Sequence, residues 1–262
     1  MRFRVGYQIH PQNCTVQQIR DAYRAADSLG VDTLWVWDHM FPLYGPPEGH
    51  HFACMPLLVA IAVETTRARF GSLVHANSYR NPELLAYDIA TMDQLSGGRA
   101  ILGIGAGWFE RDYQEYGFEF GDAPFRLRDL GTALPRIKSR LGKLMPPPVG
   151  SVPIMIGGGG EKVTLKLTAQ YADMWNTFPP VENWQRKNQI LTEWCQKVGR
   201  DPKVVERTCS ISPDLYGKID DLLRAGVQHF ILRGVQPFDL KPLEELLKLS
   251  GRCPVGRSRR GG

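Results

Sequence analysis

Two histidines, an acid and an amide stand where an enzyme could use them. Asp38 and His39 close an apolar run that begins at Asp32, and histidine can donate or accept a proton near neutral pH. His75 and Asn77 follow the next apolar run and could hydrogen-bond a heterocyclic ligand. A purely structural role is the alternative for each residue, because such side chains also form hydrogen bonds with one another and stabilise loops.

Two glycine clusters predict that a ligand approaches the main chain closely. Gly157 to Gly160 lie between an apolar run and a predicted helix, where N–H groups and the helix dipole favour an anion such as phosphate. Gly105 and Gly107, on either side of Ala106, end another apolar run, where glycine permits a tight turn or a close contact. A flexible turn is the alternative for the first cluster.

Charged and aromatic residues near these groups can be explained either by a role in ligand binding or by a structural role. Arg80 could clamp an anion or carry a surface charge. The stretch 107–120 combines aromatic rings with acids, which suits either a substrate wall or packing against a neighbouring helix.

The surrounding pattern predicts the elements that must position these residues. Apolar runs alternate with helix-like segments along the chain, which implies a parallel sheet because each return crosses over through a helix. About eight such units predict a closed (β/α)8 barrel, with an open doubly wound sheet as the alternative. In a barrel, chemistry belongs at the carboxyl ends of the strands, which is where His39 and the glycine clusters stand. Strands are predicted at 3–9, 32–38, 70–74, 100–104, 153–156, 174–177, 207–211 and 229–233, and helices at 15–29, 54–65, 82–95, 126–141, 161–171, 184–198, 218–225 and 240–249.

Composition narrows the class of protein. The 262 residues, 43% of them hydrophobic, suit a single barrel domain at 1–250, followed by a disordered basic tail at 251–262. Five scattered cysteines without a C-x-x-C pair argue against a disulfide framework or a metal site. The net charge of +5 lacks a basic stripe, so we expect no nucleic-acid partner. Without a membrane-length apolar run or a signal-peptide pattern, we expect a cytoplasmic protein with no membrane contact.

Three segments together resemble the bacterial-luciferase-like oxidoreductases that use flavin or deazaflavin, with F420-dependent enzymes as the nearest branch. They are LWVWDHM (34–40), VHANSYRNPELLAYDIATMDQLSGGRAILGIGAGW (74–108) and PIMIGGGGEKVTLKLTAQYADMWN (153–176). The resemblance implies a TIM barrel whose mouth holds the ring of F420, or of FMN as the alternative. It also implies a non-proline cis peptide bond at Leu73–Val74 behind the ring and room for the ring beside the glycines at 105 and 107. The implied ring contacts are Asp38, Leu73, Val74, His75, Asn77, Gly105, Ala106 and Gly107, and the implied phosphate contacts are Gly157, Gly158, Gly159, Gly160 and Glu161.

The same resemblance implies hydride transfer between the deazaflavin and a small organic substrate. His39 would be the proton donor, and Trp37, Trp108 and Phe109 would border an activated C=C, C=N or carbonyl group. A homodimer is expected. The connection before the fifth strand is shorter than is usual in the family, so the substrate side is open or covered by a partner subunit. Two alternatives stay open: an FMN-dependent monooxygenase served by a separate cofactor reductase, and a non-catalytic flavin-binding or subunit protein.

Overall fold

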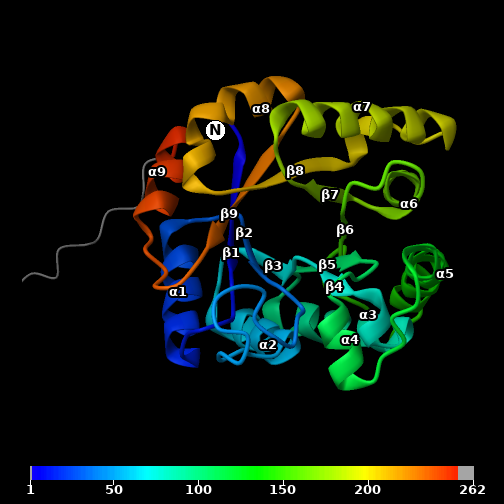
Figure 1. Cartoon of the computed structure of the whole chain (residues 1–262), viewed down its shortest axis with the longest axis horizontal. Coiled ribbons are helices and arrows are strands. Elements are labelled where there is room, and N and C mark those ends of the chain that lie inside the picture. The colour runs from blue at the N-terminus through cyan, green and yellow to red at the C-terminus, as the bar shows by residue number, and fades with distance from the viewer. Residues whose placement is uncertain (1, 253–262) are drawn as a thin grey trace, which may run out of the picture.

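Parallel strands surrounded by helices form a closed barrel in this protein (Figure 1). The structure, a computed structural model, describes residues 2–252. The strands pair in the order β3-β2-β1-β9-β8-β7-β6-β5-β4, and an additional pairing of β3 with β5 closes the ring. The predicted (β/α)8 barrel is therefore confirmed. The strands are β1 (Arg4–Ile9), β2 (Thr33–Val36), β3 (Arg69–Ser72), β4 (His75–Ala76), β5 (Ala100–Gly105), β6 (Ile154–Gly157), β7 (Met174–Thr177), β8 (Glu206–Ile211) and β9 (His229–Gly234).

The helices follow the predicted pattern with small shifts at their ends. Thr15 and Gln18 cap α1 reciprocally, and Asp122 accepts a hydrogen bond from the N–H of Phe125, which starts α5 earlier than predicted. α4 is an addition to the predicted helices. The α-helices are α1 (Val16–Leu29), α2 (Cys54–Glu64), α3 (Pro82–Ser96), α4 (Glu110–Tyr116), α5 (Ala123–Leu141), α6 (Thr164–Tyr171), α7 (Val181–Lys197), α8 (Ile219–Ala225) and α9 (Lys241–Leu249), with 3-10 helices η1 (Asn77–Tyr79), η2 (Pro202–Val204) and η3 (Pro213–Lys218).

One barrel strand is interrupted at the point where the resemblance places a cis bond. β3 and β4 both pair with β5, so they are two parts of the same barrel strand. The peptide bond between Leu73 and Val74, which separates them, is cis, and this prediction is confirmed. From β1, the amide nitrogen of Gln8 donates to the carbonyl of Leu73 at 3.1 Å.

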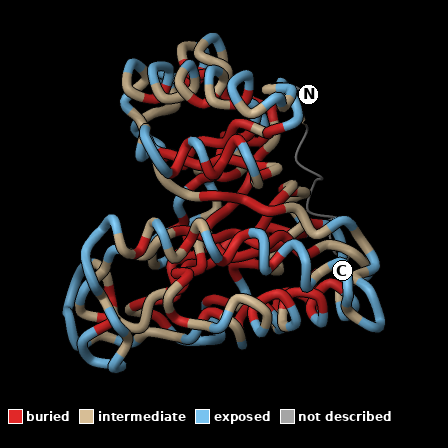
Figure 2. Tube along the Cα trace, turned by 90° about the vertical axis from the view of Figure 1, so that its right-hand side faces the viewer, coloured by how far each residue is buried: buried red, intermediate tan, exposed pale blue. Residues whose placement is uncertain are grey.

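The core consists of an inner layer and an outer shell. Residues that alternate along the strands fill the barrel, and the opposite faces pack against the helices, which Figure 2 shows as buried strands beneath exposed outer helix faces. The inner layer is made by Trp35, Ile101, Met155, Met174 and Ile231. Since this layer plugs the barrel, a ligand can enter only at its ends.

The amino end of the barrel is closed by charged groups. Asp32 precedes β2 at this end, and its carboxylate accepts hydrogen bonds from the N–H of Val5 at 2.7 Å and from Arg252 at 2.6 Å. Arg252 also donates to the carbonyl of Gly30, so the start of the predicted tail contacts the barrel. The rest of that tail, 253–262, lies outside the described residues. No helix within 2–252 combines the length and apolar character that crossing a membrane requires.

Candidate active site

A cavity of about 320 Å³ opens at the carboxyl ends of the strands, within the size range of small-molecule sites. Eleven of the predicted site residues line it, and they come from strands β2 to β6 and the loops that follow them. These are Asp38, His39, Leu73, Val74, His75, Gly105, Ala106, Gly107, Trp108, Gly157 and Gly158. Six further residues line the cavity. Gln8, Ala76 and Asn176 lie at predicted strand ends, whereas Tyr79, Thr164 and Phe178 were not predicted.

Six predicted residues do not line this cavity. Gly159, Gly160 and Glu161 lie further along the glycine loop, and Glu161 forms an ion pair with Arg186 of α7. The others lie behind the wall and are Asn77, whose amide donates to Asp129 at 2.5 Å, Trp37, which is 6% exposed, and Phe109, whose ring packs against His39. Their side chains bind the protein itself, which adjacency in the sequence does not reveal.

Val74 explains why several strand-end glycines carry no side chain. A Cβ added to Gly105 would lie 2.9 Å from a Val74 methyl, and one added to Gly157 would lie 3.0 Å from the other. Gly107 is excluded by a different group, because its Cβ would lie 1.8 Å from the hydroxyl of Tyr113 and its φ is +80°. The expectation that glycines 105 and 107 leave room for a flat ring is thus corrected: that room belongs to Val74 and Tyr113. The backbone of both glycines still borders the cavity.

Asp38 belongs to a buried polar network. Both of its carboxylate oxygens accept hydrogen bonds from Arg80, one of them at 2.9 Å, and the Nδ1 of His75 lies 3.3 Å away. Burial opposes its ionisation, but the hydrogen bonds and charges of His75 and Arg80 hold the pKa of the Asp38 carboxyl well below its usual range. Both interpretations offered for Arg80, an anion clamp and a surface charge, are therefore wrong.

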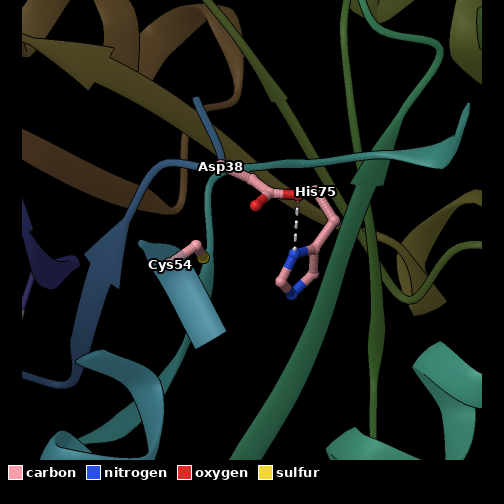
Figure 3. Close-up of side chains that lie close together, drawn as sticks. All are labelled: Asp38, Cys54 and His75. Carbon is pink, nitrogen blue, oxygen red and sulfur yellow. Dashed lines mark hydrogen bonds and ion pairs between the residues drawn. The ribbon is translucent and has the colours of Figure 1, made fainter. Parts of the chain in front are cut away.

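The thiol of Cys54, at the start of α2, lies beside this network (Figure 3). One ligand-type atom each from Asp38, Cys54 and His75 falls within 4.8 Å of the others, which is a spacing that can hold a metal ion. The Arg80 guanidinium already neutralises the carboxylate, and burial raises the pKa of the Cys54 thiol well above its usual range. The cluster is therefore best described as a structural network.

His39 has a partner that the sequence analysis missed. Its Nδ1 lies 2.7 Å from the Oδ2 of Asp112, a fully buried residue of α4. The same carboxylate accepts hydrogen bonds from the hydroxyl of Tyr79 at 2.8 Å and from the N–H of Met40 at 3.0 Å. Burial and the nearby Asp112 raise the pKa of Tyr79 far above its usual range, so this hydroxyl remains a donor. The only sequence signal for Asp112 is an acid within an aromatic stretch.

The glycine loop presents bare peptide groups to the start of α6. The N–H groups of Gly159 and Gly160 donate to no carbonyl or side chain within the described residues. The Trp175 indole donates to the carbonyl of Gly158 at 2.8 Å, which fixes the loop from below. A Cβ on Gly159 would lie 2.4 Å from the ammonium of Lys187, so this side chain of α7 covers the loop. Free N–H groups beside an ammonium suit an anionic ligand.

Aromatic rings flank the cavity on two sides. Trp108 after β5 is 63% exposed and Phe178 after β7 is 54% exposed, and both line the cavity. Trp108 also packs edge-on against His39, with 5.6 Å between ring centroids. The arrangement fits a flat heterocycle resting against Val74, with its phosphate at the glycine loop and a substrate between the aromatic rings.

Comparison with known proteins agrees with this geometry. Residues 1–247 match the family described as luciferase-like monooxygenase. An F420-dependent glucose-6-phosphate dehydrogenase of Amycolatopsis mediterranei is 33% identical over 105 residues, which is 40% of this chain and only 31% of that enzyme. A phthiodiolone/phenolphthiodiolone dimycocerosates ketoreductase of Mycobacterium bovis is 27% identical over 70% of this chain and 57% of its own length.

Among solved structures, an F420-dependent secondary alcohol dehydrogenase in complex with an F420-acetone adduct superposes with a TM-score of 0.84 at 17% identity, covering 97% of this chain and all of that one. At this identity the superposition supports the fold. The match over nearly the whole sequence is what assigns the family. The chain belongs to the luciferase-like monooxygenase family.

Proposed function

We propose that this protein is an F420-dependent oxidoreductase that transfers a hydride between the deazaflavin and a small organic substrate. The observation that carries the proposal is the cavity between Val74 and Gly158, together with the unpaired N–H groups of Gly159 and Gly160 that follow next in the chain, before α6. Val74 offers an apolar floor for a ring, and the two N–H groups offer donors for a phosphate. The F420-dependent enzymes among its relatives support the choice of cofactor.

Within this proposal, some residues bind the cofactor and others contact the substrate. F420, when bound, supplies the hydride donor or acceptor carbon. The free N–H groups of Gly159 and Gly160 would bind its phosphate, and Val74 would support its ring. The imidazole of His39 would exchange a proton with the substrate, while Trp108 and Phe178 would exclude water around it.

Within this proposal, the substrate carries an activated C=C, C=N or carbonyl group. The names of two similar proteins, a ketoreductase and a secondary alcohol dehydrogenase, favour the carbonyl–alcohol couple. Since α5 ends at Leu141 and β6 begins at Ile154, the connection between them is short, and the exposed rings of Trp108 and Phe178 leave the substrate side accessible.

We also propose that the protein forms a homodimer through α2 and α3. Both helices expose apolar side chains to solvent, which is typical of a surface that contacts another chain. These side chains are Val59, Val63, Leu84, Tyr87 and Leu95. Sedimentation velocity is expected to show a dimer, and Leu84→Arg is expected to convert it to a monomer. A wild-type monomer would refute this part of the proposal.

Calorimetric titration with F420 and with FMN tests the proposed cofactor. Binding of F420 with micromolar or better affinity and much weaker binding of FMN is expected. Preference for FMN, together with oxygen uptake when a separate reductase supplies reduced flavin, would establish the monooxygenase alternative instead. Binding of neither would favour a subunit role. With F420 bound, reduction of ketones and oxidation of secondary alcohols are the first reactions to assay.

A further inference from the structure

Asp112 is a fully buried acid, and its carboxylate forms hydrogen bonds to residues in or next to the candidate site. Its Oδ1 accepts from the N–H of Met40 at 3.0 Å, and its Oδ2 accepts from the hydroxyl of Tyr79 at 2.8 Å. His39 Nδ1 lies 2.7 Å from that same Oδ2. The carboxylate therefore joins three points: the loop after β2, the helix η1 and the imidazole.

These contacts decide which nitrogen of His39 carries the hydrogen. A backbone N–H can only donate, and Met40 fixes the orientation of the Asp112 carboxylate independently of the imidazole. Both oxygens of Asp112 already act as acceptors, from Met40 and Tyr79, so the 2.7 Å contact requires a hydrogen on Nδ1. In the neutral ring Nε2 is then the acceptor.

Nε2 is also the nitrogen that a substrate can reach. It makes no hydrogen bond within residues 2–252 and is not among their buried unpartnered atoms, and His39 lines the cavity. The Trp108 and Phe109 rings pack edge-on against the imidazole, at 5.6 Å each between centroids, which limits its rotation. The side chain is thus held in position and in tautomer, with one nitrogen left for chemistry.

We propose that Asp112 is a positioning residue that holds His39 as the Nδ1–H tautomer, with Nε2 directed at the substrate. The proposal rests on the hydride-transfer function given above. In alcohol oxidation, bound F420 in its oxidised form would supply the hydride acceptor, and Nε2 of His39 would accept the hydroxyl proton as the carbonyl forms. In the reverse direction the Nε2 proton returns to the carbonyl oxygen. Asp112 keeps its place throughout and stabilises the imidazolium.

Nitrogen-15 NMR of the histidine side chains in the full-length protein tests this directly. In alkaline buffer, where the neutral ring is observed, His39 is expected to show the Nδ1–H tautomer, with its signal assigned from its loss in His39→Gln. In Asp112→Asn, an amide NH2 group that donates replaces the carboxylate oxygen that accepted from Nδ1. His39 in this variant is therefore expected to convert to the Nε2–H tautomer. Wild-type His39 in the Nε2–H form, or an unchanged tautomer in a folded Asp112→Asn, would overturn the proposal.

Two controls separate this result from misfolding and from failure of the proposed function. Asp129→Asn also converts a part-buried hydrogen-bonded aspartate near the site, since Asp129 binds Asn77, and it is expected to leave the His39 tautomer unchanged. The NMR measurement needs no cofactor, so it is independent of whether F420 binds. Once a substrate is available, Asp112→Asn is expected to slow hydride transfer by about 100-fold or more, the range for loss of general acid–base catalysis, with F420 affinity unchanged. Equal kinetics for the Asp112→Asn and Asp129→Asn variants would also overturn it.

Discussion

Val74 occupies the space where a side chain on Gly157 would lie: a Cβ there would be 3.0 Å from one methyl of Val74 and 3.1 Å from the other. Since Gly157 does not have a positive φ, an alanine is permitted by the backbone, and the clash falls on Val74 alone. Gly157→Ala should push Val74 into the cavity and weaken F420 binding by about 10-fold or more, as expected for overpacking by 1–3 kcal/mol.

The double variant Gly157→Ala/Val74→Ala tests that reasoning. Removing the methyls of Val74 relieves the clash, so the two substitutions should be strongly non-additive when F420 affinities are measured by calorimetry. Gly131→Ala, in α5, is the matched control, because its Cβ would lie at an ordinary 3.6 Å from Leu167. It should leave affinity unchanged and raise stability by up to about 1 kcal/mol. Additive losses would contradict the proposed contact.

The buried pair of Arg80 and Asp38 predicts a large stability effect. Asp38 is 4% exposed, and Arg80→Met would leave its carboxylate with His75 as its one partner among residues 2–252. We expect a loss of about 3 kcal/mol in the free energy of unfolding, measured in urea, because removing one member of a buried pair leaves an uncompensated charge. Arg136→Met breaks the more exposed pair with Glu83 and should cost less than about 1 kcal/mol. Similar losses in both variants would show that Asp38 does not depend on Arg80.

His10 predicts a pH dependence of stability. Burial, with a smaller contribution from Arg233, lowers the pKa of His10 to about 3. The unfolded chain therefore binds this proton below about pH 6.5, whereas the folded protein does not until about pH 3. Stability from this group is complete above pH 6.5 and is lost as the pH falls, by up to about 1.4 kcal/mol per unit. Burial also lowers the pKa of His51 to about 4, which acts in the same direction.

Urea unfolding at several pH values checks the contribution of His10. Between pH 6.5 and 5, His10→Asn should lose less stability than wild type, by about 2 kcal/mol. His50 is exposed, so His50→Asn should follow the wild-type curve. If the wild-type and His10→Asn curves run parallel, the buried imidazole is not the group that titrates.

Lys187 predicts a phosphate-dependent contribution to affinity. Its ammonium covers Gly159 and forms no ion pair with a described acid. Lys187→Gln should weaken binding of F420 by about 10-fold, as for loss of a hydrogen bond to a charged group, but leave binding of the deazaflavin lacking its phosphate unchanged. Lys166→Gln removes the same charge from α6, where the ammonium lies over the Trp194 ring, and should have little effect. If Lys187→Gln weakens the binding of F420 and of the phosphate-free deazaflavin equally, Lys187 does not contact the phosphate.

The sequence predicts the barrel well, because alternating apolar runs and helices report directly on strands that are buried on both faces. It also places His39 and the glycine loop at the mouth, since strand direction decides which end of the barrel a residue occupies. It does not predict Asp112 as the partner of His39, or Arg80 as the partner of Asp38. Those contacts join loops and helices that are distant along the chain. The reason for the glycine at 105 was missed for the same cause, because only the folded strands bring Val74 beside it.

Trp108 is the one exposed ring among the six tryptophans, at 63%, and it lies against the cavity. The protein therefore carries its own optical reporter. Its emission should respond to whatever occupies the mouth, so unlabelled compounds can be screened by light alone, and Trp108→Phe would supply the silent background.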